Sequence, residues 1–306
     1  MSERIFITGG AGFIGSNVAE YYSTKGIDVV VYDNLKSGFR KNIEKFSNIT
    51  FIDGDILNYN LLKESMKNST KVFHFGAEIS VPLSMKNPEL TEQINTIGTI
   101  NTLKSMVENN IKTIIFASSA AVYGDNPEVP KTVSMPPNPI SPYAISKLSG
   151  EYYLNMFVRE HKIKATTTRF FNVFGERQNP FSSYAAAVPI FITKALKNEQ
   201  ITIFGDGEQT RDFIYVKDLV SYLIWLSSYN SGTYNIGYGN FITINELAKS
   251  IIQYTNSKSE IVYLPPREGD IKHSYANIGE LKDIKIDLIG FKKGLANTID
   301  YFIENV

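Results

Sequence analysis

Residues 4–34 read RIFITGGAGFIGSNVAEYYSTKGIDVVVYDN and set the architecture that we predict for the chain. An apolar strand over residues 5–8 runs into Gly9, Gly12 and Gly15, and an amphipathic helix follows. Glycine permits a sharp turn, the close approach of a pyrophosphate to the backbone and tight contact between helix and strand. The N-terminus of the helix would then face the phosphates. The segment therefore predicts a β-turn-α-β unit that binds a dinucleotide.

The acid that ends the second strand of this unit, Asp33, indicates which dinucleotide is bound. A carboxylate at this position accepts hydrogen bonds from the adenosine ribose hydroxyls and repels a 2′-phosphate. NAD is therefore favoured over NADP. The alternative is that Asp33 is a turn residue before Asn34.

The next two strands are expected to bring further groups to the cofactor. They are predicted over residues 48–52 and 71–75. Asp55, after the first of them, would meet the adenine. Gly76 and Ala77, after the second, would let the backbone lie against the dinucleotide.

Two polar residues of this region are interpreted differently. His74 lies inside a predicted strand, and we expect a buried, hydrogen-bonded histidine rather than a ligand. Asn95 lies early in a long helix predicted over residues 88–109. It would either cap that helix or reach the cofactor from the side.

Residues 116–151 carry the candidates for catalysis. Tyr143 and Lys147 are four residues apart in a segment with helical apolar spacing, so both side chains project from one face of the predicted helix. A free phenol titrates near ~10, and an ammonium within about 4–6 Å would lower that pKa. Tyr143 would then act as general base and, once protonated, as general acid, while Ser119 would offer a hydroxyl to the same substrate oxygen. The alternative is an exposed Tyr/Lys pair on an ordinary helix.

Length and composition exclude several classes of protein. The chain has 306 residues, of which 43% are hydrophobic and 20% charged, as in a globular protein with a sizeable core. Lys plus Arg and Asp plus Glu number 31 each, so no global field favours nucleic acid or an acidic membrane surface. No cysteine and only three dispersed histidines are present, which argues against a metal site. We expect a cytoplasmic protein with no signal peptide, no membrane span and no metal.

The order of the predicted elements defines the fold class. Strands and helices alternate up to Asn172, which favours a parallel sheet covered on both faces, and polar loops separate short elements thereafter. We predict an α/β fold, a Rossmann-type doubly wound parallel sheet with a smaller C-terminal substrate-binding lobe. The NAD-binding domain would span residues 1–171, completed by about 213–237, and a discontinuous substrate-binding lobe would take most of 172–306.

A run of motifs gives the chain its resemblance to a known family. In order they read GGAGFIG, YDN, GDI, HFGA, SSAAVYG, SPYAISK, RFFNVFG, RDFIYVKDL and PPREGD. This order resembles the extended short-chain dehydrogenase/reductase superfamily and, within it, the NAD-dependent UDP-sugar 4-epimerases, over residues 3–303. The resemblance implies a seven-stranded Rossmann domain. It also implies that Ser119, Tyr143 and Lys147 are catalytic and that a hydride passes from C4 of the sugar to NAD and back through a transient 4-keto sugar.

The resemblance also implies two sets of binding residues. The cofactor would be bound by Gly9, Gly12, Phe13, Ile14, Gly15, Asp33, Asn34, Ser37, Gly38, Asp55, Ile56, Phe75, Gly76, Ala77, Asn95, Ser118, Tyr143, Lys147, Phe170 and Val173. The UDP-sugar would be bound by Ser80, Ser119, Asn172, Ala186, Ala187, Val188, Phe204, Arg211, Arg267, Asp270 and Ser274. Among these, the two arginines would clamp the diphosphate through charge-assisted bonds.

The identity of the sugar depends on one position above all. Ser274 falls where glucose-restricted relatives carry a tyrosine, so a small residue would leave space beside C2 for an acetamido group. Alternatively, Ser274 is merely a small loop residue and another side chain, such as Ile79, closes the pocket. We expect UDP-glucose and UDP-galactose as substrates, and UDP-N-acetylglucosamine and UDP-N-acetylgalactosamine as well. Ala120 replaces the acid that related dehydratases use, which disfavours dehydration.

Two other functions stay open. One is another sugar-nucleotide enzyme of the superfamily, such as a decarboxylase or an epimerase of a different nucleotide sugar. The other is a regulator that senses NAD without turnover, which the Tyr143/Lys147 pair argues against. Residues 88–109 and the helix of Tyr143 resemble the helices of a four-helix dimer interface, so a homodimer is expected.

Overall fold

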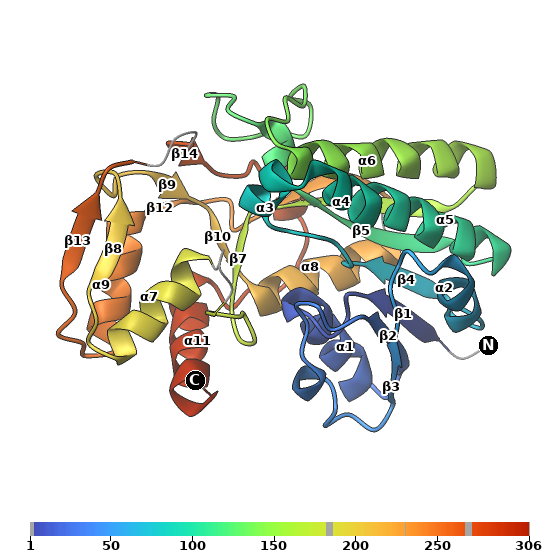
Figure 1. The fold of residues 1–306 in the computed structure, drawn as a ribbon, viewed down its shortest axis with the longest axis horizontal. Helices are drawn as coiled ribbons and strands as arrows, with labels where there is room; N and C mark the ends of the chain where they lie inside the picture. The colour runs from blue at the N-terminus through green and yellow to red at the C-terminus, as the bar shows by residue number, and fades with distance from the viewer. Residues whose placement is uncertain (1–2, 182–185, 230, 267–270, 306) are drawn as a thin grey trace. The chain divides into compact units, whose positions relative to one another are not determined.

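A seven-stranded sheet dominates the computed structural model, which describes residues 3–181, 186–229, 231–266 and 271–305. Within that part of the chain the strand order is β11-β6-β5-β4-β1-β2-β3, and Figure 1 labels the five strands from β5 to β3. Strand β1 pairs in parallel with β2 and β4, β2 with β3, and β4 with β5. The strands are β1 (Arg4–Thr8), β2 (Asp28–Asp33), β3 (Ile49–Asp53), β4 (Lys71–His74), β5 (Thr113–Ser119), β6 (Lys164–Phe170) and β11 (Gly232–Ile236). The predicted α/β Rossmann-type fold is confirmed.

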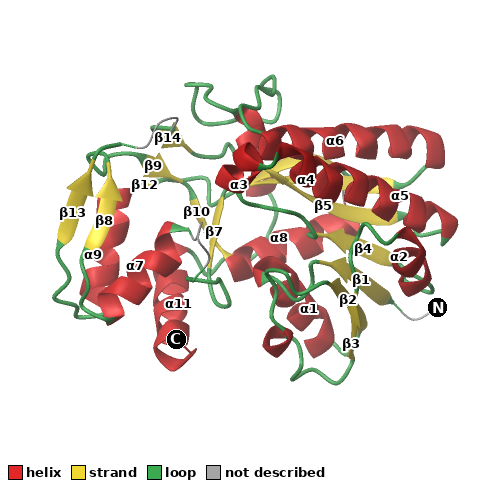
Figure 2. Ribbon diagram, viewed as in Figure 1, coloured by secondary structure: helices red, strands yellow, loops and turns green. Residues whose placement is uncertain are grey.

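Alternate residues of these strands face two helical layers, as the pleat of a strand requires. Phe6 and Val72 belong to a cluster with Leu103 on the side of α2, α5 and α6. On the other side, Tyr22 of α1 packs against Phe73, with ring centroids 5.6 Å apart. Figure 2 shows the helices against the sheet. They are α1 (Phe13–Thr24), α2 (Tyr59–Ser65), α3 (Val81–Lys86), α4 (Pro88–Glu92), α5 (Gly98–Glu108), α6 (Pro142–His161) and α8 (Val216–Tyr229).

The helix predicted over residues 88–109 is interrupted by a wide turn. Between α4 and α5, residues Gln93–Ile97 form a π-helix. Asn95 lies inside it, so Asn95 does not cap the helix. Its side chain accepts from the backbone of Glu78 at 2.8 Å and donates to the Ser146 hydroxyl at 2.9 Å. The interruption therefore turns a polar side chain inward toward the segment that follows β4.

By backbone proximity the chain divides into two compact units. The first holds the described residues of 1–124, 136–169 and 222–234, and the second those of 125–135, 170–221 and 235–306. Residues 125–135 join the second unit because Lys131 pairs with Ala276. The functional lobes inferred from the sequence remain a prediction.

The second unit is built from short strands, four whole helices and the first residues of α8, among its described residues. Strand β7 pairs with β10, β8 with β13, and β9 lies between β12 and β14. Their bounds are β7 (Asn172–Phe174), β8 (Ile201–Phe204), β9 (Thr210–Arg211), β10 (Phe213–Tyr215), β12 (Ile242–Thr243), β13 (Ile261–Leu264) and β14 (His273–Ser274). The helices are α7 (Ala187–Leu196), α9 (Ile244–Tyr254), α10 (Gly279–Lys282) and α11 (Phe291–Asn305).

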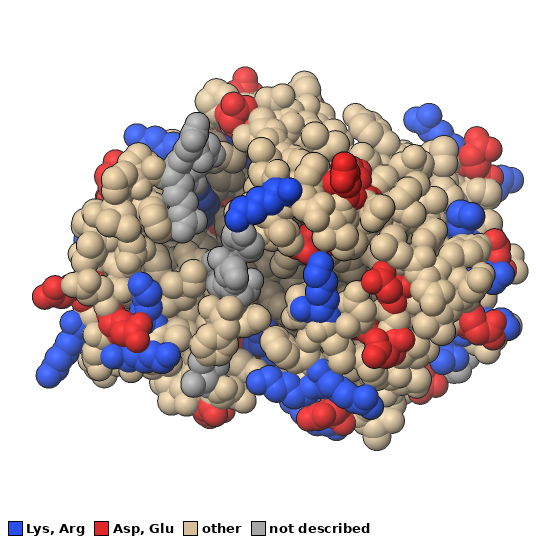
Figure 3. All heavy atoms as spheres, viewed as in Figure 1, with Lys and Arg blue, Asp and Glu red and all other residues tan. Residues whose placement is uncertain are grey.

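Charge on the surface has no dominant sign. On the face drawn in Figure 3, acidic and basic side chains are interspersed, and over the whole chain Lys plus Arg and Asp plus Glu number 31 each. None of the helices in the described part of the chain is long and apolar enough to cross a membrane.

Candidate active site

The loop between β1 and α1 packs as closely as it does only because it is built from glycine. Gly9 has a φ of +65°, and a Cβ there would lie 2.7 Å from the nitrogen of Gly76. A Cβ on Gly15 would lie 2.2 Å from the carbonyl oxygen of Gly9. Gly12 is the N-cap of α1 and supplies no side chain to cap it. The first N–H groups of an α-helix have no partner within the helix, and together with the close backbone packing this helix terminus fits the pyrophosphate of a dinucleotide.

Asp33 holds this loop against the end of β2. Its Oδ2 accepts from the N–H of Ala11 at 2.9 Å, and its Oδ1 accepts from the N–H of Leu35 at 2.8 Å. Burial raises the pKa of Asp33, while these backbone hydrogen bonds lower it in part. Asp33 is thus more than a turn residue, because it bridges the glycine loop to the segment after β2. Its bonds to a ribose remain a prediction.

The end of strand β5 meets the predicted catalytic helix. The carbonyl of Ala117 accepts from Lys147 Nζ at 2.9 Å. The Ser119 hydroxyl accepts from the N–H of Ala121 at 3.1 Å and is hydrogen-bonded to the phenol of Tyr143. Lys147 is 5% exposed, so the alternative of an exposed Tyr/Lys pair is wrong. The structure brings Ser119, Tyr143 and Lys147 together as the sequence predicts.

The protonation of this group differs from the expectation. Burial raises the pKa of Tyr143, and the bond from Ser119 lowers it by less. Lys147 Nζ lies 5.9 Å from the centroid of the phenol ring and donates to the carbonyl of Ala117, so its charge acts on the phenol without a direct bond to the ring hydroxyl and does not outweigh burial. The expectation of a lowered phenol pKa is wrong for this arrangement. Burial also lowers the pKa of Lys147 to about 8.

His74 connects the glycine loop to the helical layer, and the prediction that it is buried and hydrogen-bonded is confirmed. Its Nδ1 lies 2.7 Å from the Thr8 hydroxyl and its Nε2 lies 3.0 Å from the Thr99 hydroxyl. Because the Thr99 hydroxyl donates to the carbonyl of Asn95, Nε2 must carry the proton. Burial, aided by Lys147, lowers the pKa of His74 to about 3, so the ring is neutral.

The other predicted cofactor residues follow the carboxyl ends of the strands. Asp55 lies after β3 and accepts from the side chain of Asn34 at 3.0 Å. The N–H of Gly76, after β4, donates to the Thr8 hydroxyl at 3.1 Å. Ser118 is 2% exposed and its hydroxyl donates to Glu151 at 2.5 Å. Phe13 and Ile14 lie in the first turn of α1, and Ser37, Gly38, Ile56, Phe75 and Ala77 follow the carboxyl ends of β2, β3 and β4. Phe170, at the end of β6, and Val173, in β7, belong to the second unit. Their contacts with NAD remain predictions.

Two of the predicted substrate residues are neighbours in the second unit. Arg211 of β9 and Ser274 of β14 are paired, and Arg211 donates to the carbonyl of Thr210 at 2.9 Å. Ser80 caps α3 by accepting from the N–H of Leu83. The others lie at the start of β7, the end of β8 and the first turn of α7: Asn172, Phe204, Ala186, Ala187 and Val188. Arg267 and Asp270 lie outside the described residues.

Sequence reasoning missed a buried carboxylate in each unit. Glu151 follows Lys147 by one helical turn, and the continued stripe of Tyr143, Lys147 and Glu151 was the available signal. Asp212 is completely buried and accepts from the backbone of Tyr238 at 2.6 Å. Burial raises the pKa of Asp212 to about 6. No short motif distinguishes Asp212 from a surface acid.

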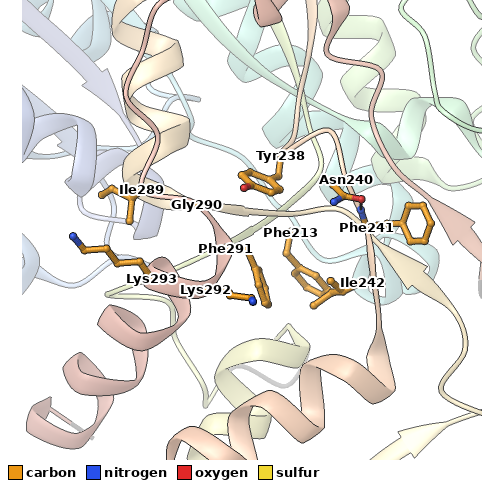
Figure 4. Close-up of a pocket in the computed structure, with 10 residues that line it drawn as sticks. All are labelled: Phe213, Tyr238, Asn240, Phe241, Ile242, Ile289, Gly290, Phe291, Lys292 and Lys293. Atoms are coloured by element: carbon orange, nitrogen blue, oxygen red, sulfur yellow. Dashed lines mark hydrogen bonds between the residues drawn. The ribbon is translucent and has the colours of Figure 1, made fainter.

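The second unit also contains a cavity of about 440 Å³ that no motif indicated. Figure 4 shows the rings of Phe213, Tyr238 and Phe291 around it. None of the described predicted substrate residues lines it. Its lining is Phe213, Tyr238, Asn240, Phe241, Ile242, Ile289, Gly290, Phe291, Lys292 and Lys293.

Together, the glycine loop and the Ser119, Tyr143 and Lys147 group define a dinucleotide-dependent enzyme of the short-chain dehydrogenase/reductase type. In the described residues no cluster of His, Cys, Asp and Glu could hold a metal.

Comparison with known proteins gives the family. The model of the NAD dependent epimerase/dehydratase family matches residues 5–237. The putative UDP-glucose 4-epimerase of Methanocaldococcus jannaschii is 38% identical over 98% of this chain and 99% of its own. UDP-glucuronic acid decarboxylase 1 of Danio rerio is 33% identical over 98% of this chain and 72% of its own.

Solved structures agree with the family model. UDP-N-acetylglucosamine 4-epimerase from Methanobrevibacter ruminantium M1, in complex with UDP-N-acetylmuramic acid, matches with a TM-score of 0.94 and 38% identity, covering 100% of both chains. UDP-glucose 4-epimerase of Thermus thermophilus, in complex with NAD, matches with a TM-score of 0.92 and 31% identity over 99% of this chain and 100% of that one. The chain belongs to the NAD-dependent epimerase/dehydratase family, and the predicted family and cofactor are confirmed.

Proposed function

We propose that this enzyme interconverts the C4 epimers of UDP-hexoses, both UDP-glucose with UDP-galactose and the corresponding N-acetylated pair. The observation that carries the proposal is the Ser119, Tyr143 and Lys147 group at the carboxyl end of β5, in a chain whose relatives are named UDP-sugar 4-epimerases.

The chemistry requires a base that can give its proton back. Bound NAD supplies the acceptor and donor of the C4 hydride, and the positive charge of its oxidised ring favours the phenolate. Tyr143 takes the proton of the C4 hydroxyl while the C–H bond breaks, which leaves a 4-keto sugar. Ser119 donates to the C4 oxygen throughout. After the sugar turns, Tyr143 returns the proton and the hydride reaches the other face of C4, so the reaction is redox-neutral.

The nucleotide is assigned to the second unit. Arg211 and Arg267 clamp the diphosphate, Phe204 packs near the uracil, and Asp270 accepts from a ribose hydroxyl or orients Arg267. Asn172 holds a diphosphate or sugar oxygen. Ala186, Ala187 and Val188 complete this assignment in the second unit, and Ser80, in the first unit, stays a predicted contact of the UDP-sugar.

Acceptance of N-acetylated sugars rests on Ser274. Its small side chain, beside Arg211 in the register of β14 with β9, leaves space at C2 of the sugar. The similarity to a UDP-N-acetylglucosamine 4-epimerase supports the assignment.

The test is product analysis by NMR after incubating the purified protein, without added cofactor, with UDP-glucose and separately with UDP-N-acetylglucosamine. Conversion of both supports the proposal and retained NAD. Conversion of UDP-glucose alone would show that the small side chain of Ser274 does not suffice to admit N-acetylated sugars. If neither reacts after NAD is added, the epimerase assignment fails.

A second candidate is decarboxylation of UDP-glucuronic acid, which the similarity to UDP-glucuronic acid decarboxylase 1 favours. The same Tyr143 base and hydride transfer at C4 would produce a β-keto acid that loses CO₂. Incubation with UDP-glucuronic acid decides, because release of CO₂ with a UDP-pentose product identifies this activity.

We also propose that the enzyme is a homodimer. Helix α6 exposes Ile145, Tyr152 and Met156 by 46%, 63% and 47%, and Met85 of α3 is 61% exposed. Apolar side chains exposed together on adjacent helices favour burial against another surface, and α6 is the helix of Tyr143, one of the two helices that the resemblance places in a dimer interface; the other spans residues 88–109. Light scattering that gives only the monomer mass of 34.4 kDa would contradict it.

A further inference from the structure

A buried ion pair lies beside the predicted catalytic group. Arg169 of β6 binds Glu151 of α6 with two bonds, Nη2 to Oε2 at 2.7 Å and Nε to Oε1 at 3.0 Å. Both side chains are only 6% exposed. Oε1 also accepts from the Ser118 hydroxyl at 2.5 Å, and Arg169 donates its Nη1 to the Tyr123 hydroxyl at 3.0 Å. Both carboxylate oxygens of Glu151 are therefore engaged.

Glu151 lies on the same face of α6 as the reactive residues. Tyr143, Lys147 and Glu151 follow one another at four-residue spacing on α6 and form one stripe. Ala117 and Ser118, neighbours on β5, receive Lys147 and Glu151 in turn. The next strand residue, Ser119, meets Tyr143.

Glu151 is one helical turn from Lys147, at the spacing where a carboxylate and an ammonium normally pair. They are not paired. Among the ion pairs of the described residues, Glu151 bonds to Arg169, while Lys147 bonds to the neutral carbonyl of Ala117. A carboxylate turned toward Lys147 would neutralise the charge of the ammonium and would raise the pKa of the neighbouring phenol.

The other titratable groups described around this stripe do not replace the positive charge of the Lys147 ammonium. His74 of β4 is neutral because burial lowers its pKa to about 3. Tyr123 bonds to Arg169. Glu78, which follows β4, pairs with Lys36 at 3.0 Å.

We propose that Arg169 and Ser118 are positioning residues that hold the Glu151 carboxylate away from Lys147, so that the ammonium acts on Tyr143 and the reacting oxygen. This inference rests on the proposed function, since it gives Tyr143 the role of base. It adds three residues, on β5, β6 and α6, to the group that sets the protonation of the site.

The test compares Arg169→Met with the double variant Glu151→Gln/Arg169→Met in the NAD-loaded enzyme. In the single variant, Glu151 loses its partner and turns to Lys147. The acidic limb of the kcat profile should then move up by about one pH unit, so kcat at a fixed pH on that limb should fall about tenfold. Removing both charges should return the midpoint to that of the wild type. A folded Arg169→Met enzyme with the wild-type midpoint would overturn the proposal.

Two further variants keep the test decisive. Breaking a buried pair is strongly destabilising, more so than replacing both partners, so thermal unfolding is measured for each protein. If Arg169→Met does not fold, Ser118→Ala decides, because it releases only one bond to Oε1 and should move the midpoint in the same direction by less. An unchanged midpoint there contradicts the proposal. Ser227→Ala is the matched control, since its hydroxyl accepts from Lys71 at 3.0 Å, remote in sequence from this stripe.

A direct titration separates this inference from the proposed function. The ultraviolet difference between each enzyme and its Tyr143→Phe counterpart follows the phenolate without any substrate. If no UDP-sugar is epimerised, the proposed function fails, yet the shift of the phenolate midpoint in Arg169→Met still tests the positioning role.

Discussion

Lys147 donates its ammonium proton to the carbonyl of Ala117 at 2.9 Å and not to the phenol one helical turn away. Strand β5 thus fixes the position of the Lys147 ammonium, and helix α6 fixes the position of the Tyr143 phenol. Because burial lowers the pKa of Lys147 to about 8, this charge is present at neutral pH and is lost in mildly alkaline solution.

The alkaline limb of the activity should therefore belong to Lys147. We expect kcat of the wild type to fall as pH rises through about 8, where the ammonium deprotonates. Lys147→Arg stays charged and should keep its smaller activity to higher pH. The kcat profile between about pH 6 and 10 measures this. An alkaline limb at the same pH in both enzymes would assign it to another group.

Tyr143→Phe should remove the base and leave the fold intact. The ring stays and only the hydroxyl bonded to Ser119 is lost. We expect kcat to fall by about 10²–10⁴, with NAD still retained. Epimerisation assays and the absorbance of bound cofactor measure the two effects. Survival of the activity would require a different base.

Gly15→Ala should be far more damaging than Gly12→Ala. A Cβ on Gly15 would approach the carbonyl oxygen of Gly9 to 2.2 Å, whereas one on Gly12 would approach it only to 3.2 Å. We expect a loss of about 2–3 kcal/mol of stability for the first variant and under ~1 for the second. Urea unfolding and NAD retention measure both, and equal effects would contradict the close packing described here.

Ser274→Tyr should restrict the substrate range. A bulky ring on β14 would occupy the space that we assign to the acetamido group, so activity on UDP-N-acetylglucosamine should fall at least ~10-fold more than activity on UDP-glucose. Ser274→Ala is the control and should keep both activities. Parallel loss of both substrates in the tyrosine variant would point to general disruption.

Asp212 should make stability fall as the pH rises. Burial raises its pKa from 3.8 to about 6, so the folded state disfavours the ionised form. The contribution is fully present below about pH 4 and is lost as the pH rises through about 6, up to about 3 kcal/mol in all. Asp212→Asn does not titrate, although one amide oxygen replaces two acceptors. The difference in urea stability between the two proteins should change over this window, and a constant difference would contradict the assignment.

The sequence predicted what local chemistry determines. Strand β1, the glycine loop and α1 follow from residues adjacent in the chain, and so does the one-face placement of Tyr143 and Lys147. It could not predict the partner of each polar group. Lys147 bonds across 30 positions to Ala117, and Arg169 reaches back 18 positions to Glu151. The packing of separate helices and strands against one another determines these hydrogen-bond partners.

The second unit was harder to predict for a related reason. Strands β9, β12 and β14 have two residues each, too few for any periodicity, and they pair across long intervals of sequence. The motif containing Arg211 indicated a function for this segment but not its structure. The buried role of Asp212 in the same motif depends on backbone groups of Tyr238, Gly239 and Ala276.

The π turn at Gln93–Ile97 sets the rotational phase of the helix that follows it. A π turn closes with one residue more than an α turn, so the extra residue is taken up within Gln93–Ile97. Leu103 and Met106 of α5 thus stay in the core beneath the sheet. A chain one residue shorter at this point would close an ordinary α turn, so this segment can absorb a change of length that elsewhere in the helix would rotate the later side chains by about 100°.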